Sequence, residues 1–269
     1  MRDISDLLTN DESTASLDRA ALDIARLEYP DLDPDPWLRL LDDLAFQIAD
    51  LAGDLTDSRR FVEVANGHLF RTVGLRGNQS EYYDVRNSCL NDVLDRRLGI
   101  PITLSVVYIE VARRLAKPVH GIGLPTHFVV QFDDGDLNVF IDPFHRGRFL
   151  SKADCVRLVA ERTGASPPDS AFQPCTPRQI AIRMLQNMKG IYVREQEYAK
   201  ALRVFDLLIA GKAAPEEYKQ RAVIHLQMRR MRDAQTDLET YLAMEPDATD
   251  RADALAQIEA IRRYLAALN

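Results

Sequence analysis

The chain has 269 residues, of which 46% are hydrophobic and 28% charged, a balance typical of a globular protein with one large or two ordinary domains. Its net charge of −7 argues against nucleic acid or an anionic membrane surface as the main partner. No run approaches the roughly 18 apolar residues of a membrane span, and the polar N-terminus predicts no signal peptide. Cys89, Cys155 and Cys175 match no disulfide framework, so we expect a cytoplasmic protein.

The N-terminal part, residues 16–95, is predicted to be helical because apolar residues recur every three or four positions. A segment rich in proline and aspartate, residues 29–36, separates the first helix from the second. Asp57 or Ser58 is expected to cap a third helix that ends at Gly74.

The stretch 87–144 carries the motifs around which the chain is organised. Apolar residues at intervals of three and four predict a helix over residues 102–115, and Pro101 suits its first turn, where no backbone N–H is needed. Two strand-like runs follow, residues 127–132 and 139–142, and an Asp-Asp-Gly-Asp turn between them predicts an antiparallel hairpin. A helix, a strand that begins with His and a strand that ends with Asp are the skeleton of a Cys-His-Asp thiol site.

Four short motifs of this stretch carry a family resemblance. They are Gly99-Ile100-Pro101, Arg113-Arg114-Leu115, His127-Phe128-Val129 and Ile141-Asp142-Pro143. They resemble the transglutaminase-like core, whose pattern is Gly-x-Cys at a helix start, an arginine-rich helix end, a strand beginning with His and a later strand ending in Asp-Pro. The wider match is to the SirB-type bacterial family, a transglutaminase-like domain followed by tetratricopeptide (TPR) repeats. The resemblance implies a helix-rich α+β fold: a papain-like core with a small antiparallel sheet, then TPR-like helical hairpins.

The departure from the family pattern concerns the nucleophile. Counting forward from Gly99 and back from Arg113 places the family cysteine at Pro101, which has no nucleophilic group. The thiolate is what attacks in this chemistry, so His127 and Asp142 are predicted to form a pair with no thiol in register. We therefore predict a pseudoenzyme. A purely structural interpretation of the pair is also open, because an Asp before Pro can fix a turn.

Cys89 is the alternative nucleophile. A place at a helix N-terminus would lower the pKa of its thiol, and Cys89, His127 and Asp142 would then serve a cysteine-dependent hydrolase or acyl-transferase. The other interpretation is a small apolar residue packed at a helix start, a position that is commonly aromatic in the family. A distance of about 4 Å or less from its sulfur to the His127 ring would favour the enzyme.

The remaining histidines match no metal-binding motif. His120, His127 and His145 could gather round a metal with Asp142, but their spacing supports no such site. No glycine-rich phosphate loop is present, so we predict no metal and no cofactor. His68 is interpreted as a packing or surface residue of the third helix.

The C-terminal part contains a repeat. We predict a core over residues 1–165, a proline-rich linker over 166–177, and helical repeats over 178–269. Residues 198–210 align with residues 231–243 at a spacing of 33, with small alanines in each second helix, which resembles TPR repeats. Two repeats are fewer than the usual minimum of about three, so we expect them to lean on the core.

Two functions therefore compete. In the first, a non-catalytic transglutaminase-like protein binds a protein or peptide through its TPR-like region, with no nucleic acid and no membrane as partner. In the second, the protein is a thiol hydrolase or acyl-transferase that uses Cys89. The proline at the nucleophile position favours the first. The repeats could also form a helical layer that only stabilises the protein.

Overall fold

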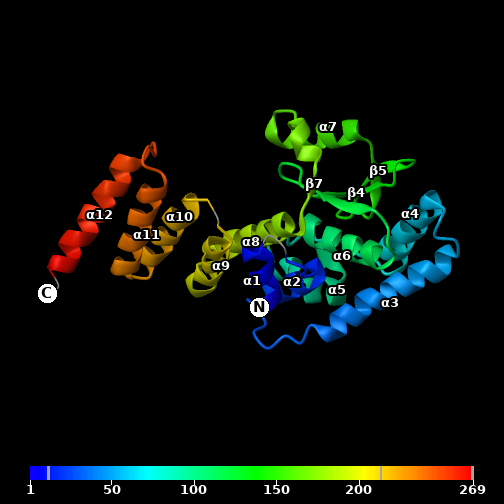
Figure 1. Cartoon of the computed structure of the whole chain (residues 1–269), viewed down its shortest axis with the longest axis horizontal. Coiled ribbons are helices and arrows are strands. Elements are labelled where there is room, and N and C mark those ends of the chain that lie inside the picture. Colours follow the sequence, from blue (N-terminus) through cyan, green and yellow to red (C-terminus); the bar gives the residue numbers. More distant parts are fainter. Residues whose placement is uncertain (11–12, 213, 268–269) are drawn as a thin grey trace. The chain divides into compact units, whose positions relative to one another are not determined.

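The computed structural model describes residues 1–10, 13–212 and 214–267, and it divides into two compact units (Figure 1). The first unit contains residues 1–7 and 13–184, and the second contains the other described residues. The division falls inside a helix, α8 (Pro177–Arg194). The use of residues 166–177 as a domain linker stays a prediction.

The chain before the main sheet is mostly helical, as the sequence predicts. Asp57 caps α4, because its carboxylate accepts a hydrogen bond of 3.0 Å from the backbone N–H of Arg60. Pro101 is the first residue of α6, where its missing N–H costs no helical hydrogen bond. The helices before α8 are α1 (Arg2–Thr9), α2 (Leu17–Ala25), α3 (Asp35–Ala52), α4 (Ser58–Asn66), the π-helical turn η1 (Gly67–Thr72), the 3-10 turn η2 (Val85–Ser88), α5 (Leu90–Arg96), α6 (Pro101–Arg114), α7 (Lys152–Thr163) and the 3-10 turn η3 (Asp169–Phe172).

A five-stranded antiparallel sheet lies at the centre of the first unit, with strand order β6-β5-β4-β3-β7. The predicted hairpin is confirmed as β4 and β5, with Val130 opposite Ile141. The strands are β3 (Val119–Ile122), β4 (Val129–Asp133), β5 (Asn138–Asp142), β6 (Arg148–Leu150) and β7 (Pro174–Cys175). Separately, β1 (Arg76–Gly77) pairs in parallel with β2 (Leu98–Gly99).

Helices cover both faces of this sheet (Figure 1). On one face, Val129 and Phe140 belong to a buried cluster with Val159 of α7. On the other, α6 packs against β3 and β4, and the ring of Phe132 lies 5.9 Å from that of Phe61 on α4. The antiparallel register brings the start of β4 and the end of β5 to the same end of the hairpin. His127 and Asp142 stand at that end, and both are buried.

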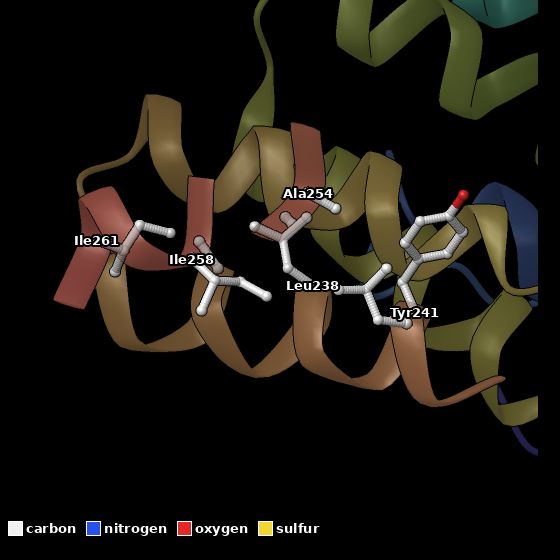
Figure 2. Close-up of a cluster of buried hydrophobic side chains, with 8 residues drawn as sticks. Leu238, Tyr241, Ala254, Ile258 and Ile261 are labelled. Atoms are coloured by element: carbon white, nitrogen blue, oxygen red, sulfur yellow. The ribbon is translucent and has the colours of Figure 1, made fainter. Parts of the chain in front are cut away.

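The second unit is a stack of antiparallel helices. After the last part of α8 come α9 (Tyr198–Ala210), α10 (Glu216–Gln227), α11 (Met231–Met244) and α12 (Arg251–Ala266). The aligned alanines of the repeat, Ala201 and Ala234, are both fully buried. Leu238 of α11 and Ile258 of α12 lie in one apolar cluster (Figure 2), so α12 closes the stack. The predicted helical repeats are confirmed. Within the described residues, no helix is long and apolar enough to cross a membrane.

Candidate functional site

The predicted pair is formed: Nε2 of His127 lies 2.9 Å from Oδ2 of Asp142, and both side chains are buried. His127 stands two residues before β4, after a tight turn in which Thr126 adopts the left-handed φ of 62°. Arg183 fixes this turn, since its guanidinium donates to the carbonyl oxygens of His127 (2.6 Å) and Leu124 (2.9 Å). Asp142 is the last residue of β5.

A third residue, His145, completes the cluster. Its Nδ1 lies 2.7 Å from the same oxygen, Oδ2 of Asp142, and its backbone N–H donates to Oδ1 at 3.2 Å. The turn that carries it closes at Gly147, whose N–H donates to the carbonyl oxygen of Asp142 at 2.9 Å. Sequence reasoning considered His145 only as a metal ligand. The available signal was its spacing of three residues from Asp142, which suits a side chain that folds back on a turn.

Asp142 is the electrostatic centre of this cluster. Its burial disfavours the charged form, but the hydrogen bonds with His127 and His145 outweigh that effect and hold the pKa of Asp142 well below its usual value. Asp142 is therefore a carboxylate, an acceptor on which both imidazole rings can converge as donors.

The other ring nitrogen of His127 faces an arginine. Nη1 of Arg162 lies 3.4 Å from Nδ1 of His127 and also donates to the carbonyl oxygen of Thr126 at 3.2 Å. Because a guanidinium can only donate, this contact places the proton of the neutral imidazole on Nε2, toward Asp142. The ring of Phe144 packs edge-on against the imidazole, with centroids 6.2 Å apart. Both nitrogens of His127 thus have partners, and neither partner is a thiol.

The helix start at the family nucleophile position offers no substitute group. Pro101 is buried, and its carbonyl accepts the Ser105 hydroxyl at 2.8 Å. The Thr103 hydroxyl donates to the carbonyl oxygens of Asn87 (2.7 Å) and Ile100 (3.1 Å). Both hydroxyls therefore bond to backbone carbonyls. If Pro101 occupies the position of the family cysteine, it should face His127, and this stays a prediction.

The three cysteines form no disulfide within the described residues. Cys89 is the N-cap residue of α5 and is completely buried; its role as a nucleophile toward His127 stays a prediction. Cys155 packs in the cluster between α7 and the sheet, where burial and then the charge of Asp142 raise its pKa to about 11. Burial also raises the pKa of Cys175. Cys155 and Cys175 are therefore thiols, not thiolates, at neutral pH.

A cavity of about 540 Å³ lies beside His145. Phe144 forms part of its wall and sits directly over Gly77, where an added Cβ would overlap the ring. The charged side chains that line it are Arg76 and Arg146, and no carboxylate is among its described lining residues. The cavity therefore favours an anionic or polar guest.

These features define a class: a transglutaminase-like domain that keeps the His-Asp pair, joined to a helical repeat unit. Comparison with family models gives the same division. The Transglutaminase-like superfamily matches residues 35–186, and a tetratricopeptide repeat model matches residues 188–259. The resemblance inferred from the sequence is confirmed.

The relatives narrow the class. The chain is 35% identical over 246 residues to a UPF0162 protein of Xylella fastidiosa (strain 9a5c), which covers 89% of this chain and 88% of that protein. It is 28% identical over 183 residues to a UPF0162 protein of Vibrio cholerae, covering 66% of this chain and 67% of that protein. Mouse F-box only protein 21 is 29% identical over 160 residues, 55% of this chain and 25% of that protein. The chain belongs to the UPF0162 family of transglutaminase-like proteins.

Proposed function

We propose that this protein is a non-catalytic member of the transglutaminase-like superfamily and acts by binding a protein or peptide through its TPR repeats. The observation that carries the first half is the surroundings of His127. Its two ring nitrogens contact Asp142 and Arg162. The helix that begins with the nucleophilic cysteine in the family pattern begins with Pro101 in this chain. Without a nucleophile the covalent route is lost, whatever the orientation of the base.

The second half rests on the repeats, a class of domain that generally mediates protein interactions. The first helix of each repeat carries an exposed valine, Val193 on α8 (37% exposed) and Val223 on α10 (47% exposed). An extended or helical partner segment that covers these valines would remove apolar surface from water.

The test is selection of peptides from a random display library on the immobilised full chain. Enriched peptides should bind the purified protein, and the double variant Val193→Asp/Val223→Asp should weaken them by about tenfold or more, since it places two charges under the bound segment. Phe46→Asp is the matched control, because Phe46 is an exposed apolar residue of α3 in the first unit. Failure to enrich any peptide, or equal binding by the double variant, would argue against the repeats as the binding element.

The intact pair at 2.9 Å supports one alternative, a cysteine-dependent hydrolase or acyl-transferase that uses Cys89, His127 and Asp142. A thiol-reactive acyl probe separates the two functions. Labelling confined to Cys89, and lost in both Cys89→Ser and His127→Ala with folding intact, would overturn the non-catalytic proposal. Slow labelling of the cysteines that His127→Ala does not change would support it.

A further inference from the structure

We propose that His127, Asp142 and His145 form a binding site for one divalent transition-metal ion such as Zn²⁺. One ligand atom from each residue can be chosen so that all three lie within 4.8 Å of one another. The two imidazole nitrogens converge on a single carboxylate oxygen, at 2.9 Å for His127 and 2.7 Å for His145. Two imidazoles and one carboxylate on one side of an ion are a recurrent set for zinc and ferrous iron. This site goes beyond peptide binding by the repeats and does not depend on it.

Two of the three separations between ligand atoms are already close to those around a metal ion, whereas the set as a whole is confined only to within 4.8 Å. Metal–ligand bonds of about 2.1 Å at tetrahedral or octahedral angles separate neighbouring ligand atoms by about 3.0–3.4 Å. The nitrogen–oxygen separations in the present structure, 2.9 Å and 2.7 Å, are a few tenths of an ångström shorter than this, because each pair of atoms is joined by a direct hydrogen bond. On binding, the proton that each neutral imidazole now donates to Asp142 would move to its other ring nitrogen, Nδ1 of His127 and Nε2 of His145, and the freed lone pairs would bind the ion.

Access and free coordination positions come from the His145 side. The side chain of His145 is 35% exposed, while those of His127 and Asp142 are almost completely buried. His145 also lines the cavity of about 540 Å³, together with Arg76 and Arg146. Three protein ligands leave at least one position open on zinc, and water or an anionic group in this cavity would fill it.

Two groups next to the cluster have opposite effects on metal binding: the backbone N–H of His145 favours it and Arg162 opposes it. The backbone N–H of His145 donates to Oδ1 of Asp142 at 3.2 Å, which orients the carboxylate with Oδ2 toward both rings. Arg162 opposes binding, because ligation through Nε2 of His127 moves its proton to Nδ1, which faces Nη1 of Arg162 at 3.4 Å. Arg162 is exposed, so its guanidinium can turn away to solvent, but this movement would break its hydrogen bond to the carbonyl oxygen of Thr126. Its removal should therefore tighten the binding of the ion.

The test is isothermal titration of the full chain, freed of any histidine tag, with zinc sulfate. We expect one zinc ion per chain, and His145→Ala should weaken binding by at least about tenfold. His120→Ala is the matched control: His120 is an exposed histidine on β3 outside the cluster, so its removal should leave the affinity unchanged. Arg162→Ala should bind zinc several-fold more tightly.

Two results would overturn the proposal: no saturable zinc binding by the wild-type chain, or equal binding by the wild type and His145→Ala. Circular dichroism checks that His145→Ala is folded. If it is not, His145→Gln serves instead, and the Arg162→Ala result is read independently. Cobalt(II) absorption gives a second readout, because visible bands at one equivalent that disappear in the His145 variant require this histidine near the ion. Bands that persist unchanged in the folded variant would contradict the site.

Discussion

The turn that carries His145 depends on Gly147, and replacing this glycine by alanine tests how tightly the site is built. Gly147 has a φ of 72°, in the left-handed region that alanine disfavours. A Cβ at this position would overlap the ring of Phe70 and lie 3.0 Å from Cγ of Asn66. The Asn66 amide also donates to the carbonyl oxygen of Gly147 at 2.8 Å, so the backbone cannot retreat without loss of a buried hydrogen bond.

The magnitude follows from these two costs. The left-handed conformation costs alanine about 1–2 kcal/mol, and forcing a methyl group into a packed site costs about 1–3 kcal/mol. Gly147→Ala should therefore destabilise the first unit by about 2–5 kcal/mol. Gly164→Ala is the matched control. Gly164 has a φ of 76° with no neighbouring atom within 4 Å of the added Cβ, so it carries only the conformational cost, about 1–2 kcal/mol.

The chain offers a specific probe for this measurement. Trp37 is its single tryptophan and lies on α3, so its fluorescence during urea denaturation reports the first unit. The difference between the two glycine variants isolates the packing cost at Gly147. If Gly147→Ala proves no more destabilising than Gly164→Ala, the described contacts with Phe70 and Asn66 do not constrain the turn, and the reasoning fails.

Two further predictions concern the buried carboxyl on α6 and the core of the second unit. Burial, together with neighbouring Asp18, raises the pKa of Glu110 above 4.5 despite its bonds to Arg113. The native state therefore loses stability as the pH rises from about 4.5 through the raised pKa. Glu110→Gln should remove that loss, and the stability of the variant relative to wild type should rise over this window in tryptophan-detected urea titrations; a pH-independent difference would contradict it. Leu238 packs in the cluster of Figure 2, so Leu238→Ala should cost about 2–5 kcal/mol, whereas Leu255→Ala, at a half-exposed position on α12, should stay within about 0.5 kcal/mol. Guanidinium denaturation followed by circular dichroism measures the stability of both variants. Equal losses of stability would show that Leu238 is not part of the core of the second unit.

Local patterns in the sequence predict the elements that depend on local physics. The hairpin of β4 and β5 follows from two alternating runs and an Asp-Asp-Gly-Asp turn, all within residues 127–142. The repeat follows from the matching alanines Ala201 and Ala234, which are both fully buried on their helices. In each case the decisive contacts join residues near in sequence or equivalent in a repeat.

Other features follow from pairings that no local pattern encodes. Strand β7 has two residues and exists because Cys175 pairs with Gly121 on β3, far away in the chain. Arg162 reaches the ring of His127 across 35 residues, from a helix whose sequence shows only an ordinary basic last turn. Short edge strands and single side chains at a site are set by the assembled fold, so composition and periodicity do not reveal them.

The His127–Asp142 pair has a structural reason to be present that is independent of catalysis. Asp142 is completely buried, and removal of a hydrogen-bond donor would leave its carboxylate short of a partner, at a cost of about 1–3 kcal/mol or more. Stability alone can therefore account for the pair, which makes it weak evidence for an enzyme. Stability does not require that a second imidazole share the same oxygen while its ring stays partly open to a basic cavity. The chemistry of this site is therefore best tested at His145 and not at the pair itself.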